Sequence, residues 1–166
     1  MNITHAVLAS HVAYQAAWRG DWVWGVPLIV LTVVFHVTGL GLIDRWVHRV
    51  TTGTIVHRHP IPTFMLVMAV VTLLATVMHA VEAGIWCMAY RVLSALPDNK
   101  TAVLYSLNAI TSYGHDNITL EGRWRLLGAI EALNGWLLFG LTTAFLFGMI
   151  VRVRSSLDNE KHRLLV

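Results

Sequence analysis

Charged residues are scarce in this chain. Asp, Glu, Lys and Arg make up 13% of its 166 residues, whereas about 25% is usual in soluble domains. Hydrophobic residues make up 56%, and the mean hydropathy is +0.62. This composition excludes an ordinary soluble domain and predicts an integral membrane protein. A chain of this length has room for a few spanning helices and for no large soluble domain.

Cysteine is almost absent. The single Cys87 lies in an apolar run, which excludes a disulfide scaffold and a cysteine-based zinc site. The formal net charge of +3 fits the basic loops of a membrane protein, and its pattern shows no nucleic-acid footprint. Residues 1–20 lack the basic start and the long apolar core of a cleavable signal peptide. We therefore expect the lipid bilayer, and no nucleic acid, as a partner.

Three long apolar segments are present. A hydrocarbon core about 30 Å thick needs about 20 apolar residues to be crossed by a helix. Residues 22–43 meet this length with only His36 ionisable, and residues 126–151 form the last segment. Between them, a segment beginning at Pro62 stays apolar to Trp86 and continues to Leu93. The sequence thus predicts an all-α membrane protein with three transmembrane helices.

The flanking segments orient these helices. Residues 1–20 carry apolar side chains at helical spacing, which predicts a short helix on the membrane surface. Lys and Arg gather in the loop of residues 44–61 and in the tail of residues 152–166. The positive-inside rule places both basic segments in the cytoplasm. The N-terminus is then outside, on the extracellular or periplasmic face.

A polar run interrupts the apolar pattern before the last helix. Residues 112–117 read Ser-Tyr-Gly-His-Asp-Asn and follow a short helix-like segment at residues 102–110. Non-helical backbone at membrane depth is tolerated only where it is buried in protein or lines a watery cavity. We therefore expect a re-entrant helix and loop, entering from the outer face, between the second and third transmembrane helices.

The segments around this loop carry a family pattern over about half of the chain. They are His79-Ala80-Val81-Glu82 with Trp86 and Tyr90, Ala95-Leu96-Pro97-Asp98, Ala102-Val103-Leu104-Tyr105-Ser106, Trp124-Arg125-Leu126-Leu127-Gly128, Glu131-Ala132-Leu133-Asn134-Gly135 and Thr142-Thr143-Ala144-Phe145-Leu146-Phe147. This order resembles the pore domain of the potassium-channel superfamily, and it is most similar to small bacterial two-pore-domain-like members.

The resemblance implies a homotetrameric pore, because four such loops line one conduction path. Residues 62–151 would form the pore domain, with a pore helix and filter-like loop at residues 101–117. It implies passive transport of inorganic cations such as K⁺, Na⁺ or Ca²⁺, without enzymatic activity, catalytic residues, a resident metal or another cofactor. It also implies the inner (plasma) membrane of a bacterium.

The filter departs from the family pattern. Potassium channels read Thr-Val-Gly-Tyr-Gly followed by Asp, and their backbone carbonyls replace the ion's hydration shell. An ungapped alignment to Ser112 through Asn117 retains only Gly114. Ser112 would offer its hydroxyl at the innermost position, whereas Tyr113 replaces a small apolar side chain. We expect a filter that does not select potassium; the alternative is a non-conducting membrane scaffold or regulatory subunit that retains the fold.

Two ionisable residues of the loop would form rings in a tetramer. Asp116 would supply a ring of carboxylates, a known device of cation channels. Protonation of His115, which titrates near neutral pH, would place positive charge beside that ring and oppose cation entry. In the alternative interpretation, both side chains turn behind the filter and brace it. The ion-pathway residues we predict are thus Ser112, Tyr113, Gly114, His115, Asp116 and Asn117.

Buried polar residues flank the loop on both long helices. Glu131 and Asn134 share a face of the third helix, and His79 and Glu82 share a face of the second. We predict that all four support the filter. His36 with His79 and Glu82 also raises a zinc or haem site, but counting depth from the predicted helix ends puts His36 toward the inner side and His79 in the outer half. The sequence thus predicts no shared site. His48, His57 and His59 are expected to be solvated; the alternative is that they bind a metal or sense cytoplasmic pH.

Overall fold

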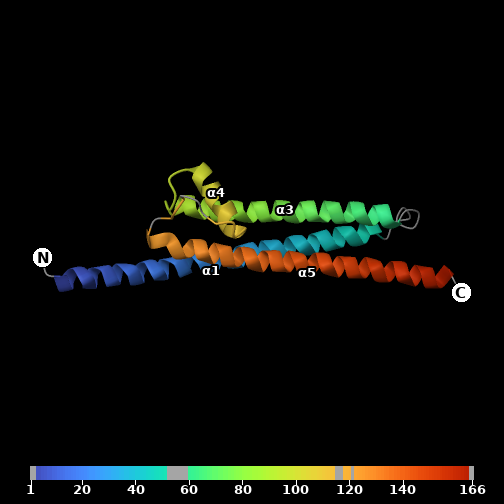
Figure 1. Ribbon diagram of the computed structural model, residues 1–166, viewed down its shortest axis with the longest axis horizontal. Helices are drawn as coiled ribbons and strands as arrows, with labels where there is room; N and C mark the ends of the chain where they lie inside the picture. The colour runs from blue at the N-terminus through green and yellow to red at the C-terminus, as the bar shows by residue number, and fades with distance from the viewer. Residues whose placement is uncertain (1–2, 52–59, 115–117, 121, 165–166) are drawn as a thin grey trace. The chain divides into compact units, whose positions relative to one another are not determined.

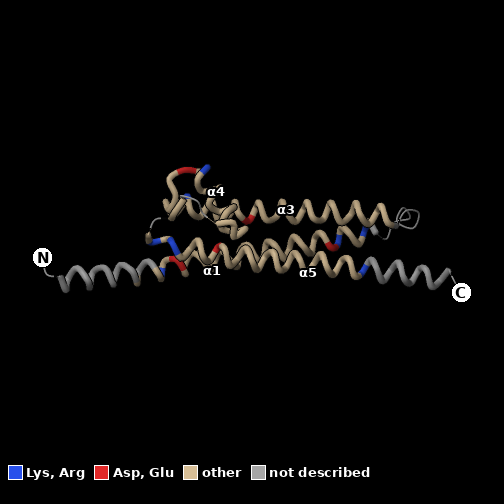
Figure 2. The backbone as a smooth tube through the Cα atoms, in the orientation of Figure 1, with Lys and Arg blue, Asp and Glu red and all other residues tan. Residues whose placement is uncertain are grey.

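The computed structural model describes residues 3–51, 60–114, 118–120 and 122–164 (Figure 1). The described residues form helices, turns and loops, and no strand occurs among them. Three helices are long and apolar enough to cross a membrane. Figure 2 shows how few Lys, Arg, Asp and Glu residues interrupt them. The prediction of an all-α, multi-pass membrane protein is confirmed at this level.

The first helix differs from its prediction. α1 runs without a break over Ile3–Thr51, so the separate surface helix at residues 1–20 is not a distinct element. It also continues through residues 44–51, the first part of the segment that was predicted to be a loop over residues 44–61. Hydropathy marks where a helix leaves the apolar layer, and charged residues such as Arg and Lys are good helix formers beyond that point. Pro27 is the only proline inside α1.

The remaining elements follow the predicted order. α3 covers Pro60–Val92, α4 covers Asn99–Ile110, a 3₁₀ turn covers Gly122–Trp124, and α5 covers Arg125–Leu164. A short helix between α3 and α5 is therefore confirmed, three residues longer at its start than the predicted segment. α5 continues as a helix through most of the segment expected to be a tail, for the same reason as α1.

The chain divides into two compact units. The first consists of Met1–Val34 and Ala80–Leu137, and the second of Phe35–His79 and Leu138–Val166. The core of the first unit includes buried side chains from α3, α4 and α5, namely Trp86, Tyr90, Ala102, Tyr105, Leu127 and Ile130. The core of the second unit consists of Leu40, Ile43, Val47, Val67, Val71, Met78 and Met149.

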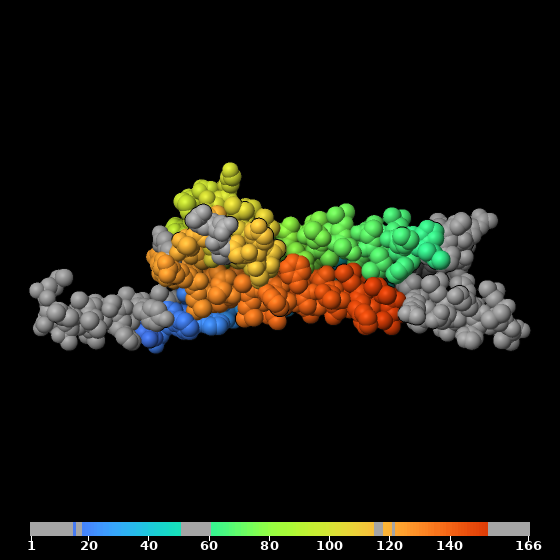
Figure 3. Space-filling model, in the orientation of Figure 1, coloured from blue at the N-terminus to red at the C-terminus, as the bar shows by residue number. Residues whose placement is uncertain are grey.

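Local signals define α4. Asp98 caps its N-terminus, where Oδ1 accepts the Thr101 backbone N–H at 2.9 Å and Oδ2 accepts the Thr101 hydroxyl at 2.7 Å. Such side chains satisfy amide donors that the first helical turn leaves open. In Figure 3 the atoms of α4 lie directly against the first turns of α5. A Cβ on Gly135 would overlap the backbone carbonyl of Ile110, so only glycine permits this approach.

Candidate functional site

The loop after α4 begins with backbone in the left-handed region. Ser112 has φ 54° and Gly114 has φ 100°. The Ser112 N–H donates to Ala109 O at 2.9 Å and the Tyr113 N–H donates to Asn108 O at 3.0 Å. These two bonds form a Schellman motif, which closes a helix C-terminus with a left-handed residue. The predicted filter residues His115, Asp116 and Asn117 lie outside the described residues.

The first two predicted filter side chains have defined surroundings. The Ser112 hydroxyl accepts a hydrogen bond from the indole Nε1 of Trp136 on α5 at 2.7 Å. Tyr113 is 84% exposed within the single chain. The structure thus brings Ser112 to α5, whereas a Thr hydroxyl in the family pattern would bind the ion. This arrangement makes Ser112 both a helix cap and an anchor for the loop.

Glu131 joins three helices in the first unit. It is fully buried, and its Oε2 accepts the Tyr90 hydroxyl of α3 at 2.5 Å. Its Oε1 lies 2.5 Å from the Ser106 hydroxyl of α4, which also lies 2.6 Å from the Ala83 carbonyl oxygen of α3. The carboxyl group of Glu131 on α5 therefore connects Ser106 of α4 to Tyr90 of α3. Its predicted role in supporting the loop stays a prediction.

The hydrogen count in this network identifies a donor. The Ser106 hydroxyl carries one hydrogen but lies within hydrogen-bond distance of two oxygens. The Ala83 carbonyl can only accept, so Ser106 donates to it. A hydrogen bond between Ser106 and Glu131 then needs a hydrogen on the carboxyl group. A neutral carboxylic acid at Glu131 that donates to Ser106 and accepts from Tyr90 would satisfy this count, and it would avoid an isolated charge inside the membrane.

Asn134 forms a hydrogen bond with a residue of α1. Its side-chain amide donates to the Thr32 hydroxyl of α1 at 2.8 Å, and Thr32 donates to the Leu28 carbonyl at 2.9 Å. Asn134 and Thr32 are fully buried. The structure therefore places this predicted filter-support residue in the contact between α5 and α1. Such interhelical polar contacts stabilise membrane bundles by about 0.6 kcal/mol each, and by up to about 1.7 kcal/mol.

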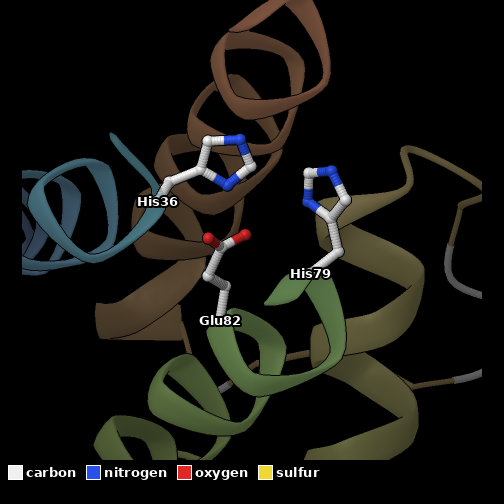
Figure 4. A group of neighbouring side chains, drawn as sticks. All are labelled: His36, His79 and Glu82. Atoms are coloured by element: carbon white, nitrogen blue, oxygen red, sulfur yellow. The ribbon is translucent and has the colours of Figure 1, made fainter. Parts of the chain in front are cut away.

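His79 lies in a second polar cluster, in the second unit. Its Nε2 is 3.2 Å from the Thr142 hydroxyl of α5, and the Nε2 of His36 on α1 is 3.0 Å from the same oxygen. The two imidazole centroids are 5.1 Å apart, and His79 also stacks on Phe139 at 4.2 Å. Figure 4 shows the two rings turned toward each other. The prediction that His36 and His79 lie at different depths is wrong.

The error came from the predicted end of the first helix. Counting from Ile43 places His36 a little to the inner side of the helix midpoint, whereas α1 continues to Thr51. At 3.6 residues per turn, roughly four turns of α1 follow His36, and roughly five turns of α3 precede His79. The two side chains therefore reach similar levels. Glu82, fully buried, follows His79 by three residues, and Figure 4 shows it on the next turn of α3.

Several residues of these clusters were not expected from the sequence. Tyr90, Ser106 and Thr142 belonged to the predicted site only as parts of the family pattern, yet each hydrogen-bonds an ionisable side chain. Trp136, which donates to Ser112, carried no prediction beyond its place in the last helix. The available signal was spacing. Thr142 lies two helical turns after Asn134 on α5, and a polar stripe of that kind predicts an interior face.

Comparisons with known proteins add no assignment. Neither protein-family models, nor curated proteins, nor solved structures gave a match to this chain. The resemblance to the potassium-channel superfamily therefore stays a prediction from the sequence pattern.

Proposed function

We propose that the chain is a subunit of a homotetrameric cation channel related to potassium channels, with an altered filter that does not select potassium. The observation that carries this proposal is the placement of α4. A helix of 12 residues, too short to span, packs on the helices on either side of it in the chain and ends in a loop with left-handed backbone at Ser112 and Gly114. This is the order of a pore helix followed by a filter.

The contacts that hold α4 favour a fixed loop. Gly135 admits the Ile110 carbonyl, and Glu131 links Ser106 to Tyr90. A conduction path needs such rigidity because ion-binding oxygens must keep their positions as water is removed from the ion. The C-terminal end of α4 also carries partial negative charge, which attracts cations toward the loop.

We propose a tetramer because the loop of one chain cannot enclose a pore by itself. A single loop encloses no pore, and cyclic oligomers are a common closed solution. The outer face of α4 carries half-exposed apolar side chains, with Val103 and Leu104 each 47% exposed. Most of each spanning helix is likewise uncovered by the chain itself. These surfaces fit contact with lipid and with neighbouring subunits.

The filter differs from that of potassium channels in three respects. Ser112 is bound to Trp136, Tyr113 projects outward, and Gly114 is the only glycine in the run. In the proposed tetramer, Asp116 forms a carboxylate ring that attracts cations, and His115 adds opposing positive charge when it is protonated. K⁺, Na⁺ or Ca²⁺ are candidate permeant ions.

The orientation is part of the proposal. In the second unit, Arg152 of α5 donates to Asp44 of α1 at 2.9 Å, so the ends of these two helices lie on one side. Both basic segments adjoin this pair, which supports a cytoplasmic location for them by the positive-inside rule. The N-terminus and the loop then face the outside of a bacterial inner membrane.

Ion flux into liposomes tests the proposal. Wild-type protein should conduct under opposed gradients of K⁺, Na⁺ and Ca²⁺, and Asp116→Asn should change the selectivity among them. Asp44→Asn is the matched control, because it removes a carboxylate that does not belong to the loop and should leave selectivity unchanged. Absence of flux for every ion between pH 5 and 8, from protein that runs as a tetramer, would favour the non-conducting scaffold or regulatory subunit.

A further inference from the structure

A groove between α1 and α5 lies entirely within the second unit and contains none of the residues of the proposed ion pathway. Its volume is about 390 Å³, which falls in the range of about 300–1,000 Å³ that is typical of ligand clefts. Most of its lining is apolar side chains and glycine, and two of its lining residues, Asp44 and Arg152, are charged. The groove thus combines an apolar interior with one acidic and one basic group.

The apolar part of the groove extends the core of the second unit to the surface. Leu40 of α1 and Met149 of α5 line the groove and are buried members of that core. Gly41 and Gly148 also line it and are exposed, and a Cβ placed on either of them meets no atom within 4 Å. The space beside these two glycines is therefore open to a chain from the surrounding lipid.

The two charged residues of the groove lie where the apolar segments end. Asp44 is the first ionisable residue after His36 along α1, and Arg152 is the first after Glu131 along α5. Because charges are costly in the hydrocarbon layer, this pair marks the level of the lipid headgroups. Arg152 Nη1 donates to Asp44 Oδ1 at 2.9 Å, and the two side chains are 61% and 38% exposed. A headgroup can therefore reach both of them.

Both members of the pair can hold a second partner while they keep the bond between them. A guanidinium has five N–H donors and a carboxylate has about four acceptor sites, and their mutual bond uses one of each. A phosphate accepts from a guanidinium, whereas an ammonium donates to a carboxylate. Arg45 and Arg49 are exposed on α1 but do not line the groove. The charges that a headgroup would contact in the groove are therefore one of each sign.

We propose that this groove binds one molecule of phosphatidylethanolamine, a zwitterionic phospholipid with a primary ammonium group. The lipid phosphate accepts from the Arg152 guanidinium, and the ammonium donates to the Asp44 carboxylate. One acyl chain lies in the open space beside Gly41 and Gly148. The site therefore recognises the headgroup by its two charges and the chain by the apolar lining.

The same two charges disfavour other common phospholipids. An anionic phospholipid supplies the phosphate but places no cation opposite Asp44. Phosphatidylcholine carries the same charges as phosphatidylethanolamine, but its quaternary ammonium has no N–H to donate to the carboxylate. Hydrogen bonds between charged groups are about twice as strong as those between neutral groups, so the missing donor should weaken binding measurably.

Native mass spectrometry of the full-length protein tests the headgroup. Delipidated protein in detergent is titrated with phosphatidylethanolamine, phosphatidylcholine or phosphatidylglycerol, each with one palmitoyl and one oleoyl chain. Wild type should bind one phosphatidylethanolamine per chain at least about tenfold more tightly than either other lipid, a difference of about 1.4 kcal/mol. Asp44→Asn should remove the preference over phosphatidylcholine, because the amide has no charge to pair with the ammonium. Equal affinities in wild type, or tighter binding of phosphatidylglycerol, would overturn the proposal.

Glycine replacements test the position of the acyl chain. Gly148→Leu fills the open part of the groove and should weaken the binding of phosphatidylethanolamine at least tenfold. Gly140→Leu is the matched control, because Gly140 lies on the same helix, meets no atom within 4 Å and does not line the groove. It should bind as wild type does. Wild-type affinity in Gly148→Leu, or equal weakening in the two variants, would overturn the proposal.

Photo-crosslinking of the wild-type chain avoids dependence on variants that fold poorly. Phosphatidylethanolamine with a diazirine in one acyl chain is irradiated with the protein in phosphatidylcholine vesicles, and peptide mass spectrometry locates the adducts. Adducts should concentrate on groove residues such as Leu40, Phe145 and Met149. An even spread over the exposed apolar residues of the three long helices would indicate ordinary bilayer contact and overturn the proposal.

The same experiment distinguishes the lipid from a second copy of the chain. A groove that is covered by a neighbouring subunit would leave its lining unlabelled while other faces of α1 and α5 are labelled, and that result would also overturn the proposal. None of these measurements needs ion flux. The lipid site and the proposed channel function therefore succeed or fail independently.

Discussion

Replacement of Glu131 tests the assignment of its proton. In the buried network that joins α3, α4 and α5, the carboxyl lies within hydrogen-bond distance of the Ser106 and Tyr90 hydroxyls. We assign it as the donor to Ser106 and the acceptor from Tyr90. Glutamine reproduces this pattern, because its amide N–H₂ can donate to Ser106 while its oxygen accepts from Tyr90. Alanine removes both bonds. Glu131→Gln should therefore be close to neutral, whereas Glu131→Ala should be strongly destabilising.

The expected destabilisation combines hydrogen bonding and packing. Interhelical hydrogen bonds in membranes contribute about 0.6 to 1.7 kcal/mol, so the two bonds of Glu131 account for about 1–3 kcal/mol. The vacated space, about 50 Å³ at about 24 cal/mol per Å³, adds about 1 kcal/mol. We expect Glu131→Ala to lower the free energy of unfolding by about 2–4 kcal/mol. Glu131→Gln should lower it by less than about 1 kcal/mol.

Unfolding in mixed micelles of mild detergent and dodecyl sulfate measures these differences. Tyr90→Phe, alone and combined with Glu131→Gln, gives a double-mutant cycle that isolates the bond between the two side chains. A Glu131→Gln variant as unstable as Glu131→Ala would refute the reasoning. That result would show that the carboxyl is ionised and that both hydroxyls donate to its charge.

Two further predictions concern α4. Gly135→Ala should displace α4, because the new methyl overlaps the Ile110 carbonyl, and should lower the free energy of unfolding by about 1–3 kcal/mol. Gly140→Ala is the control, because a methyl group there meets no neighbour. Equal destabilisation by the two variants would contradict the close contact between Gly135 and Ile110. Hydrogen bonds from the Thr101 backbone and hydroxyl lower the pKa of Asp98 below its usual 3.8. The ionised Asp98 cap should stabilise α4 above pH 3.8, and this stabilisation should be lost as the pH falls through the lowered pKa. Carboxyl NMR should therefore show that Asp98 titrates below pH 3.8, and its pKa should be higher in Thr101→Val.

Much of the fold followed from the sequence because membrane insertion imposes a strong local requirement. A spanning helix satisfies its own backbone and needs about 20 apolar residues, so composition alone marked the three long helices. The polar run after Ile110 is likewise a local signal, whereas the prediction began the short helix at residue 102 and missed the Asp98 cap. Helix ends were less accurate, since α1 and α5 continue past the apolar layer into segments that hydropathy reads as loop or tail.

The polar clusters were decided by tertiary structure. Nothing in the spacing of His36 and His79 shows that Thr142 lies between them, because the three residues come from three helices whose relative levels depend on packing. The same holds for Glu131, whose partners on α3 and α4 are 41 and 25 residues away in sequence. A hydrophobic pattern indicates the position of a residue along its own helix. The residues that it meets on neighbouring helices are set by close packing, which here depends on glycine contacts and buried hydrogen bonds.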